Sequence, residues 1–172
     1  MKLYRAKIPQ IAHDVIQRLS DEGDIVVLPE QREEAERDLA AIMEEFIRRD
    51  MELRDRIRDH MAARNVPYSD YGRVRKRVAD EMNHPSGDDI ERFLCRQFLE
   101  NMLITPNIDE VYSEDQEMHK KVMELLRGHD VDEREIREEA ESKVKNVREG
   151  TVDYEIALQK AVKEVKKRRG LI

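Results

Sequence analysis

The side chains best suited to chemistry are the five histidines, because imidazole is both a metal ligand and an acid–base group near neutral pH. Glu81 and His84 have the spacing that di-iron helical bundles use, since residues three apart share a helix face. Such a site needs a second Glu-x-x-His and two further inward-facing Glu residues. No second motif exists, and Pro85 places His84 at a helix end. We therefore expect no metal and no cofactor. Glu81 and His84 are therefore expected to be surface polar residues, as are Asp115 and His119, which are four residues apart.

Other catalytic signatures are missing from the sequence. It contains no Gly-rich phosphate loop, no Gly-x-Ser-x-Gly and no His-Glu-x-x-His, which excludes the P-loop, α/β-hydrolase and zinc-protease motifs. The single cysteine, Cys95, lies on an apolar helical stripe, so we expect a buried core residue and not an exposed, reactive thiol. Asp and Glu are too abundant for one pair to stand out as acid and base. The sequence therefore predicts a protein that is not an enzyme.

The charged side chains are sorted into acidic and basic segments. Residues 109–141 hold thirteen acidic and five basic residues, whereas residues 143–169 hold nine basic and four acidic ones. The favoured interpretation is a set of solvated helix faces with ion pairs one turn apart. The alternative is a basic surface, on the closing helices of the two halves, that contacts phosphates or a partner. Its residues would be Arg73, Arg75, Lys76, Arg77, Lys163, Lys166, Lys167, Arg168 and Arg169. The net charge of −7 and the scarcity of aromatic residues oppose it.

Composition limits the fold class. Of the 172 residues, 41% are charged and 39% are hydrophobic. No stretch approaches the roughly 18 apolar residues of a membrane helix, and the opening segment has no signal-peptide core. One cysteine excludes an intramolecular disulfide framework, and six Gly and five Pro are too few for a strand-rich fold with many turns. We expect a helix-dominated protein of the cytoplasm, with no membrane contact.

The apolar residues recur at helical spacing almost everywhere, which predicts an all-α fold of six or seven helices. A long helix is expected from about residue 30 to 64, either unbroken or broken near Asp50. Capping signals at Ser113-x-x-Gln116, at Asp132-x-x-Glu135 and at Thr151 predict the starts of the last three helices. Residues 25–28 form the one β-branched apolar run, which is either a strand or a buried connector. The fold therefore includes at most one very short strand pair.

The two halves of the chain resemble each other. The stripe between Ile11 and Leu19 matches the stripe between Leu94 and Met102 at an offset of 83 residues, and residues 24–25 match 107–108 at the same offset. Residues 42–44 match 122–124 at an offset of 80. We predict an internal duplication, with one helical unit over residues 1–84 and a second over residues 85–172, whose cores are shared or abut.

The end of the chain resembles a known family. Residues 145–154 read Lys-Asn-Val-Arg-Glu-Gly-Thr-Val-Asp-Tyr, and the following helix ends in Lys-Lys-Arg-Arg-Gly-Leu, which is similar to the close of domain-of-unknown-function family 507. The acidic Gly turn before Ile25 also fits. The chain departs from the pattern at Tyr154, where Trp is expected, and at Ala161-Val162, where a Tyr pair is expected. The resemblance implies a bacterial protein with two tandem copies of the family unit, and it implies no known activity.

The leading hypothesis is a non-enzymatic interaction or scaffold protein of the bacterial cytoplasm, which recognises a protein partner through helix faces. The alternative is an RNA- or DNA-associated protein that binds phosphates through the basic closing helices. Eight Met residues fall mostly on helical stripes, where they fill a core or line a groove for a partner helix. The long charged helix over residues 30–64 favours a homodimer, because its length exceeds what this chain is expected to cover.

Overall fold

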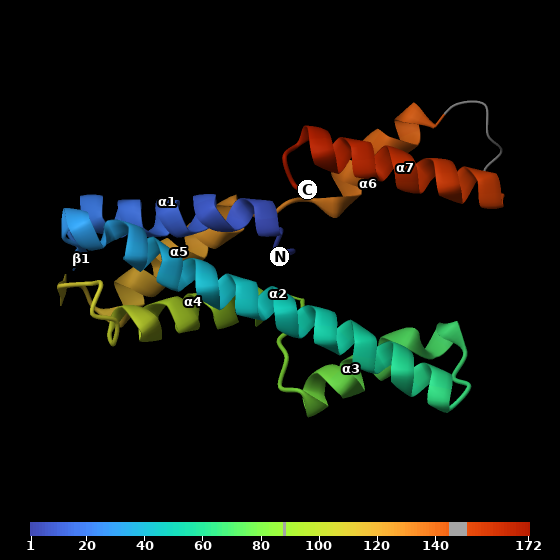
Figure 1. Ribbon diagram of the computed structural model, residues 1–172, viewed down its shortest axis with the longest axis horizontal. Helices are drawn as coiled ribbons and strands as arrows, with labels where there is room; N and C mark the ends of the chain where they lie inside the picture. The colour runs from blue at the N-terminus through green and yellow to red at the C-terminus, as the bar shows by residue number, and fades with distance from the viewer. Residues whose placement is uncertain (88, 145–150) are drawn as a thin grey trace. The chain divides into compact units, whose positions relative to one another are not determined.

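The computed structural model describes every residue except 88 and 145–150. The described chain is all-α, as predicted, with seven α-helices and one pair of very short strands (Figure 1). The helices are α1 (Ile8–Asp21), α2 (Arg32–Ala63), α3 (Tyr71–Glu81), α4 (Asp89–Met102), α5 (Asp115–Gly128), α6 (Glu133–Lys143) and α7 (Val152–Arg168), and the strands are β1 (Ile25–Val26) and β2 (Glu110–Val111). Among the described residues, no helix has both the length and the apolar content needed to cross a membrane.

The chain forms two compact units. The bundle unit comprises Met1 and Ile8–His129, and the hairpin unit comprises Lys2–Lys7 and Asp130–Ile172. This division differs from the predicted repeat boundary at residues 84 and 85, because the second half of the chain contributes α4 and α5 to the bundle and α6 and α7 to the hairpin unit. The compact units of the structure therefore have other boundaries than the repeat predicted from the sequence.

Four helices close the core of the bundle unit. α1 packs against α2 and α5, and α4 packs against α5 and α2. Each helix faces the core with an apolar stripe at helical spacing, which is why sequence periodicity identifies it. The fully buried side chains include Ile11, Val15, Ile16, Leu39, Met43, Leu94, Phe98 and Leu126. Most of the Met residues that we expected on stripes, such as Met102 and Met123, are buried here.

The two strands join the connector between α1 and α2 to the connector between α4 and α5. β1 and β2 pair antiparallel, with Ile25 opposite Val111. The β-branched run is thus a strand over its first two residues. Asp24 precedes β1, is 1% exposed, and accepts hydrogen bonds from the hydroxyl of Ser113 and, at 2.7–2.8 Å, from Nζ of Lys121.

The long helix α2 is unbroken. Of the two predicted alternatives, the unbroken helix is confirmed and a break near Asp50 does not occur. The carboxylate of Asp50 pairs one turn along the helix with Arg54 at 2.5 Å. The far half of α2 leaves the bundle and packs against α3 as a hairpin, around a small core of Leu53, Ile57, Val74, Val78 and Ala79. Asn65 allows the chain to turn here, since its φ of 49° lies in the left-handed region that Asn tolerates.

The hairpin unit is built from α6 and α7, which pack against each other. Its core consists of Tyr4, Ile136, Ala140, Leu158, Ala161, Val165 and Leu171, so the first and last segments of the chain meet in one apolar cluster. Cores of this size bury little surface, and we expect each hairpin to be less stable than the bundle.

Two of the three predicted helix caps are confirmed. The side chain of Asp132 accepts from the backbone N–H of Arg134 at 2.8 Å, and Thr151 accepts from the N–H of Tyr154 at 3.2 Å. The capping box at Ser113 is wrong, because its hydroxyl donates to Asp24 instead. α5 begins two residues later, without a side-chain cap. The Glu-Gly pair at residues 149–150 predicts a helix break before Thr151, and these two residues lie outside the described residues.

Candidate functional site: a groove between α4 and α5

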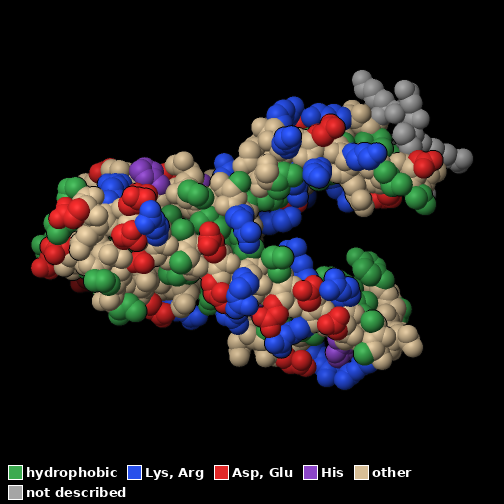
Figure 2. Space-filling view, in the orientation of Figure 1, with side chains coloured by type: hydrophobic (Ala, Val, Ile, Leu, Met, Phe, Trp, Pro, Cys, Tyr) green, Lys and Arg blue, Asp and Glu red, His purple; other side chains and the backbone are tan. Residues whose placement is uncertain are grey.

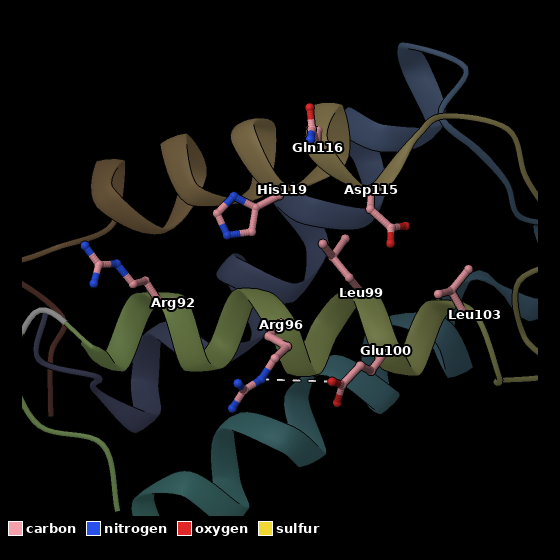
Figure 3. Close-up of a pocket in the computed structure, with 8 residues that line it drawn as sticks. All are labelled: Arg92, Arg96, Leu99, Glu100, Leu103, Asp115, Gln116 and His119. Carbon is pink, nitrogen blue, oxygen red and sulfur yellow. Dashed lines mark ion pairs between the residues drawn. The ribbon is translucent and has the colours of Figure 1, made fainter.

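An open groove of about 570 Å³ runs between α4 and α5 in the bundle unit (Figure 3). Leu99 and Leu103 form its apolar side, and Leu103 is 59% exposed. In Figure 3, Leu99 points from α4 towards α5, and His119 points from α5 towards α4. The groove is lined by Arg92, Arg96, Leu99, Glu100, Leu103, Asp115, Gln116 and His119. The sequence predicted neither the exposed apolar side of this groove nor the position of His119 opposite it.

The sequence of α4 explains why an apolar strip remains outside the core. Phe98 and Met102 face the core and are almost fully buried. Leu99 and Leu103 each follow one of them by a single residue, which is about 100° further round the helix. The two leucines are four residues apart, so they form a second, narrower apolar strip along the groove. Ile104, which is 81% exposed, extends the apolar surface beyond the end of α4.

The two ends of the groove carry opposite charges. Arg92 lies at the end nearer the start of α4, and Asp115 lies towards the other end (Figure 3). Arg96 and then Glu100 follow Arg92 along α4 and lie next to each other between these ends. The ion pair between Arg96 and Glu100 is long, at 3.9 Å, and both side chains are more than half exposed. Such exposed pairs contribute little to stability, so these groups can turn to a bound partner at small cost.

The groups beside the groove that could take part in chemistry are Asp115, His119 and Cys95. Asp115 and His119 are exposed on its rim, as predicted for surface polar residues. The thiol of Cys95 lies beneath, is fully buried, and contacts the backbone oxygen of His119 at 3.6 Å. Burial raises the pKa of Cys95 to about 12, so the thiol stays protonated and unreactive at neutral pH. Among the described residues, no group of three or more His, Cys, Asp or Glu side chains could hold a metal ion.

His84 lies in the connector after α3, outside any helix, in agreement with the effect expected of Pro85. The surface position predicted for His84 is wrong, because the side chain is 5% exposed and its ring stacks on Phe46 with the ring centroids 5.0 Å apart. Its Nε2 is 3.5 Å from Oδ1 of Asp50, and neither ring nitrogen has a hydrogen-bond partner among the described residues. His84 therefore packs with its ring against Phe46 and beside Asp50, where the α2–α3 hairpin leaves the bundle.

The burial of His84 makes stability depend on pH. Burial lowers the pKa of His84; Arg49 and Arg75 also lower it, and Asp50 opposes the shift. The unfolded chain therefore binds a proton more readily than the folded chain, and stability should fall as the pH drops below about 6.5, the ordinary pKa of histidine. Urea unfolding of the native protein and of His84→Gln, between about pH 5 and pH 8, measures this effect. The native protein should lose more stability on acidification, and equal losses would contradict it.

The predicted cations of α3 do not all share one face. Arg73, Lys76 and Arg77 lie on the exposed face, opposite the buried residues of the hairpin, whereas Arg75 is half-buried. Arg77 pairs with Glu81 at 3.1 Å, and Arg73 approaches Asp70 at 3.5 Å while its side chain remains 85% exposed. The exposed face of α3 thus keeps an excess of positive charge.

Most of the predicted cations of α7 are neutralised within the hairpin unit. Lys166 pairs with Glu133 at 3.1 Å, and Arg168 and Arg169 both pair with Glu139. Lys163 and Lys167 are exposed, and neither forms an ion pair with another described residue. Figure 2 shows Lys and Arg side chains intermingled with Asp and Glu over the described surface. The acidic segment before α7 therefore serves as the counter-charge of the basic segment, which sequence order alone does not reveal.

Comparison with known proteins gives a family and no function. No curated protein matches the chain. One family model matches residues 1–171, which is nearly the whole chain, and it agrees with the resemblance seen at the two ends of the sequence. The chain belongs to the family described as protein of unknown function (DUF507).

Proposed function

We propose that the protein is a non-enzymatic interaction protein that binds a helical segment of a protein partner in the groove between α4 and α5. The observation that carries the proposal is an apolar strip, Leu99 and Leu103, set between a positive and a negative end. An amphipathic helix binds such grooves through apolar residues spaced three or four apart. Placement in the bacterial cytoplasm remains a prediction.

The shape of the groove favours a helix over a small molecule. Sites for small molecules usually enclose most of the ligand, whereas this groove is open to solvent. The charges also define an orientation. The partner helix should place acidic residues beside Arg92 and Arg96 and basic residues beside Glu100 and Asp115, because the opposite order would bring like charges together.

The proposal is tested by site-specific photo-crosslinking in cells. A photo-reactive phenylalanine analogue at Leu103 should give a discrete crosslinked product whose mapped segment is a helix with the charge order described above. The matched control is the same analogue at Met51, which is 55% exposed on α2 and lies outside the groove. Identical products from both positions, or no product from Leu103, would count against the groove.

A second copy of this chain is one partner that the experiment can identify. The homodimer expected from the long charged helix would have a native mass of about 41 kDa, twice the chain mass of 20.4 kDa. α2 is partly covered within its own unit by α1, α3 and α4. We therefore rank a different protein above a second copy, and a native mass of about 41 kDa would reverse that order.

We also infer that the chain consists of two tandem copies of one unit in strict register, 83 residues apart. The support comes from packing: α1, β1 and the start of α2 are arranged as α4, β2 and α5 are, and α1 contacts α5 as α4 contacts α2. The strand register agrees with this offset. Ile25 corresponds to Ile108 and Val111 to Leu28, so the pairing of Ile25 with Val111 is equivalent to a pairing of Ile108 with Leu28.

The cores of the two hairpins give independent support. Residues of the α2–α3 core recur 83 positions later in the α6–α7 core, in the pairs Leu53 and Ile136, Ile57 and Ala140, Met61 and Val144, Tyr71 and Tyr154, and Val78 and Ala161. The offset of 80 suggested by residues 42–44 is unnecessary, since a constant 83 also relates buried Leu39 to Val122 and Met43 to Leu126. Sequences of further family members test the inference. Their halves should match at this offset, and the absence of any match would contradict it.

A further inference from the structure

The far end of the α2–α3 hairpin carries an exposed aromatic pair. Tyr68 is 81% exposed, and its ring stacks on Tyr71 with centroids 5.5 Å apart and an angle of 27° between the planes. Tyr71 is half-buried against the core of the hairpin, so it holds the ring of Tyr68 in place. Tyr68 thus presents an aromatic face to solvent in a fixed orientation. Tyr is enriched at interfaces, because its ring offers an apolar face while its hydroxyl stays in water.

The segment that carries this pair has an excess of positive charge. Residues 64–81 contain the five cations Arg64, Arg73, Arg75, Lys76 and Arg77 and the three carboxylates of Asp70, Asp80 and Glu81. In Figure 2, hydrophobic side chains are visible at the far end of this hairpin, and both Lys or Arg and Asp or Glu side chains lie on the surface behind them. The local balance is therefore opposite to the net charge of −7 of the whole chain.

One cation near the tip differs from the arginines along α2. Further back on α2, each exposed arginine pairs with a carboxylate within one turn, as Arg54 does with Asp50 and Arg56 with Glu52. On α3, Arg73 and Arg77 pair in the same way with Asp70 and Glu81. Lys76 is exposed and forms no ion pair with any described residue. An exposed cation without a partner, on the helix that follows an exposed ring, suits a ligand that supplies both negative charge and an aromatic face.

We propose that the tip of the α2–α3 hairpin binds single-stranded nucleic acid, with the ring of Tyr68 stacking on a base and with Arg73 and Lys76 contacting phosphates. Single strands combine a charged backbone with unpaired bases that can stack. In a duplex the bases stack on each other and are not open to the ring. This site is independent of the groove between α4 and α5, and it retains only the α3 part of the basic surface predicted from the sequence.

The full-length protein is titrated into a fluorescein-labelled oligouridylate of about 16 nucleotides, a length that spans the usual single-strand site sizes, and anisotropy reports binding. Tyr68→Ala should weaken binding by about fivefold or more, because stacking contributes about 1–3 kcal/mol per base. The matched control is Tyr112→Ala, whose ring is 68% exposed in the bundle unit, and it should leave binding unchanged. Equal effects of the two variants, or no binding at low salt, would overturn the proposal.

Salt dependence tests the phosphate contacts separately. Lys76→Gln should reduce the slope of log K against log salt by about 0.7, the value for one contact to a single strand. Lys167→Gln, which removes an exposed lysine of α7, should leave the slope unchanged. An acidic partner protein is the competing explanation. If a polyglutamate peptide displaces the oligouridylate and Tyr68→Ala has no effect, the tip recognises acidic protein and the proposal fails.

Discussion

Replacing Phe98 with alanine is expected to lower the free energy of unfolding by about 3–5 kcal/mol. Phe98 is fully buried on α4, at the centre of the apolar stripe that faces the bundle core. Since α4 is held by both α2 and α5, the surrounding helices cannot readily close the cavity that the ring leaves. Urea unfolding followed by far-ultraviolet circular dichroism measures the change.

Leu99→Ala provides the matched control for Phe98. Leu99 is the next residue on the same helix, but it is half-buried along the groove. Its loss should cost less stability, since part of its side chain stays in contact with water in the folded protein. Equal losses in the two variants would show that Leu99 is packed in the core as Phe98 is, which would contradict its placement along the groove.

Asp24→Ala is expected to lower the free energy of unfolding by about 2–3 kcal/mol, because it removes hydrogen bonds to a buried charged group. Asp24 joins the β1 connector to α5 through Lys121 and to the β2 connector through Ser113. Lys121 keeps a second carboxylate, Glu22 at 2.7 Å, and is 22% exposed, so it does not become an isolated buried charge. Thermal and urea unfolding of the full chain measure the loss.

The conservative variant Asp24→Asn separates charge from shape. It fills the same space and can still accept a hydrogen bond from Ser113, but it loses the negative charge beside Lys121. It should therefore be intermediate in stability between the native protein and Asp24→Ala. If both variants are as stable as the native protein, the polar contacts between the two connectors do not stabilise the fold.

The sequence predicts the helices well because each one carries its own apolar stripe. Ile11 and Val15, or Leu94 and Phe98, face the core at helical spacing, and this local property needs no knowledge of the partner helix. The capping box at Ser113 fails for the opposite reason. Its hydroxyl bonds to Asp24, which is 89 positions away, and local spacing contains no information about that contact.

The candidate site could not be predicted from the sequence, because it is formed only where α4 and α5 pack against each other. Leu99 and Leu103 look like ordinary members of a core stripe until α5 sets His119 across from them. The basic residues show the same limit. Arg168 and Arg169 count as free cations in the sequence, yet α6 places Glu139 beside both of them. The excess of charge on α3 becomes visible only after such pairs are removed.

The central claim is that the groove between α4 and α5 binds a partner helix. Its most direct test reverses the charge of the two groove arginines and measures the yield of the photo-crosslinked product from position 103. Arg92→Glu with Arg96→Glu should abolish most of the product, because the positive end of the groove would then repel the acidic end of the partner. The matched control reverses Arg56 and Arg58 on α2, which are exposed and outside the groove, and it should preserve the yield. An equal yield from both double variants would contradict the claim.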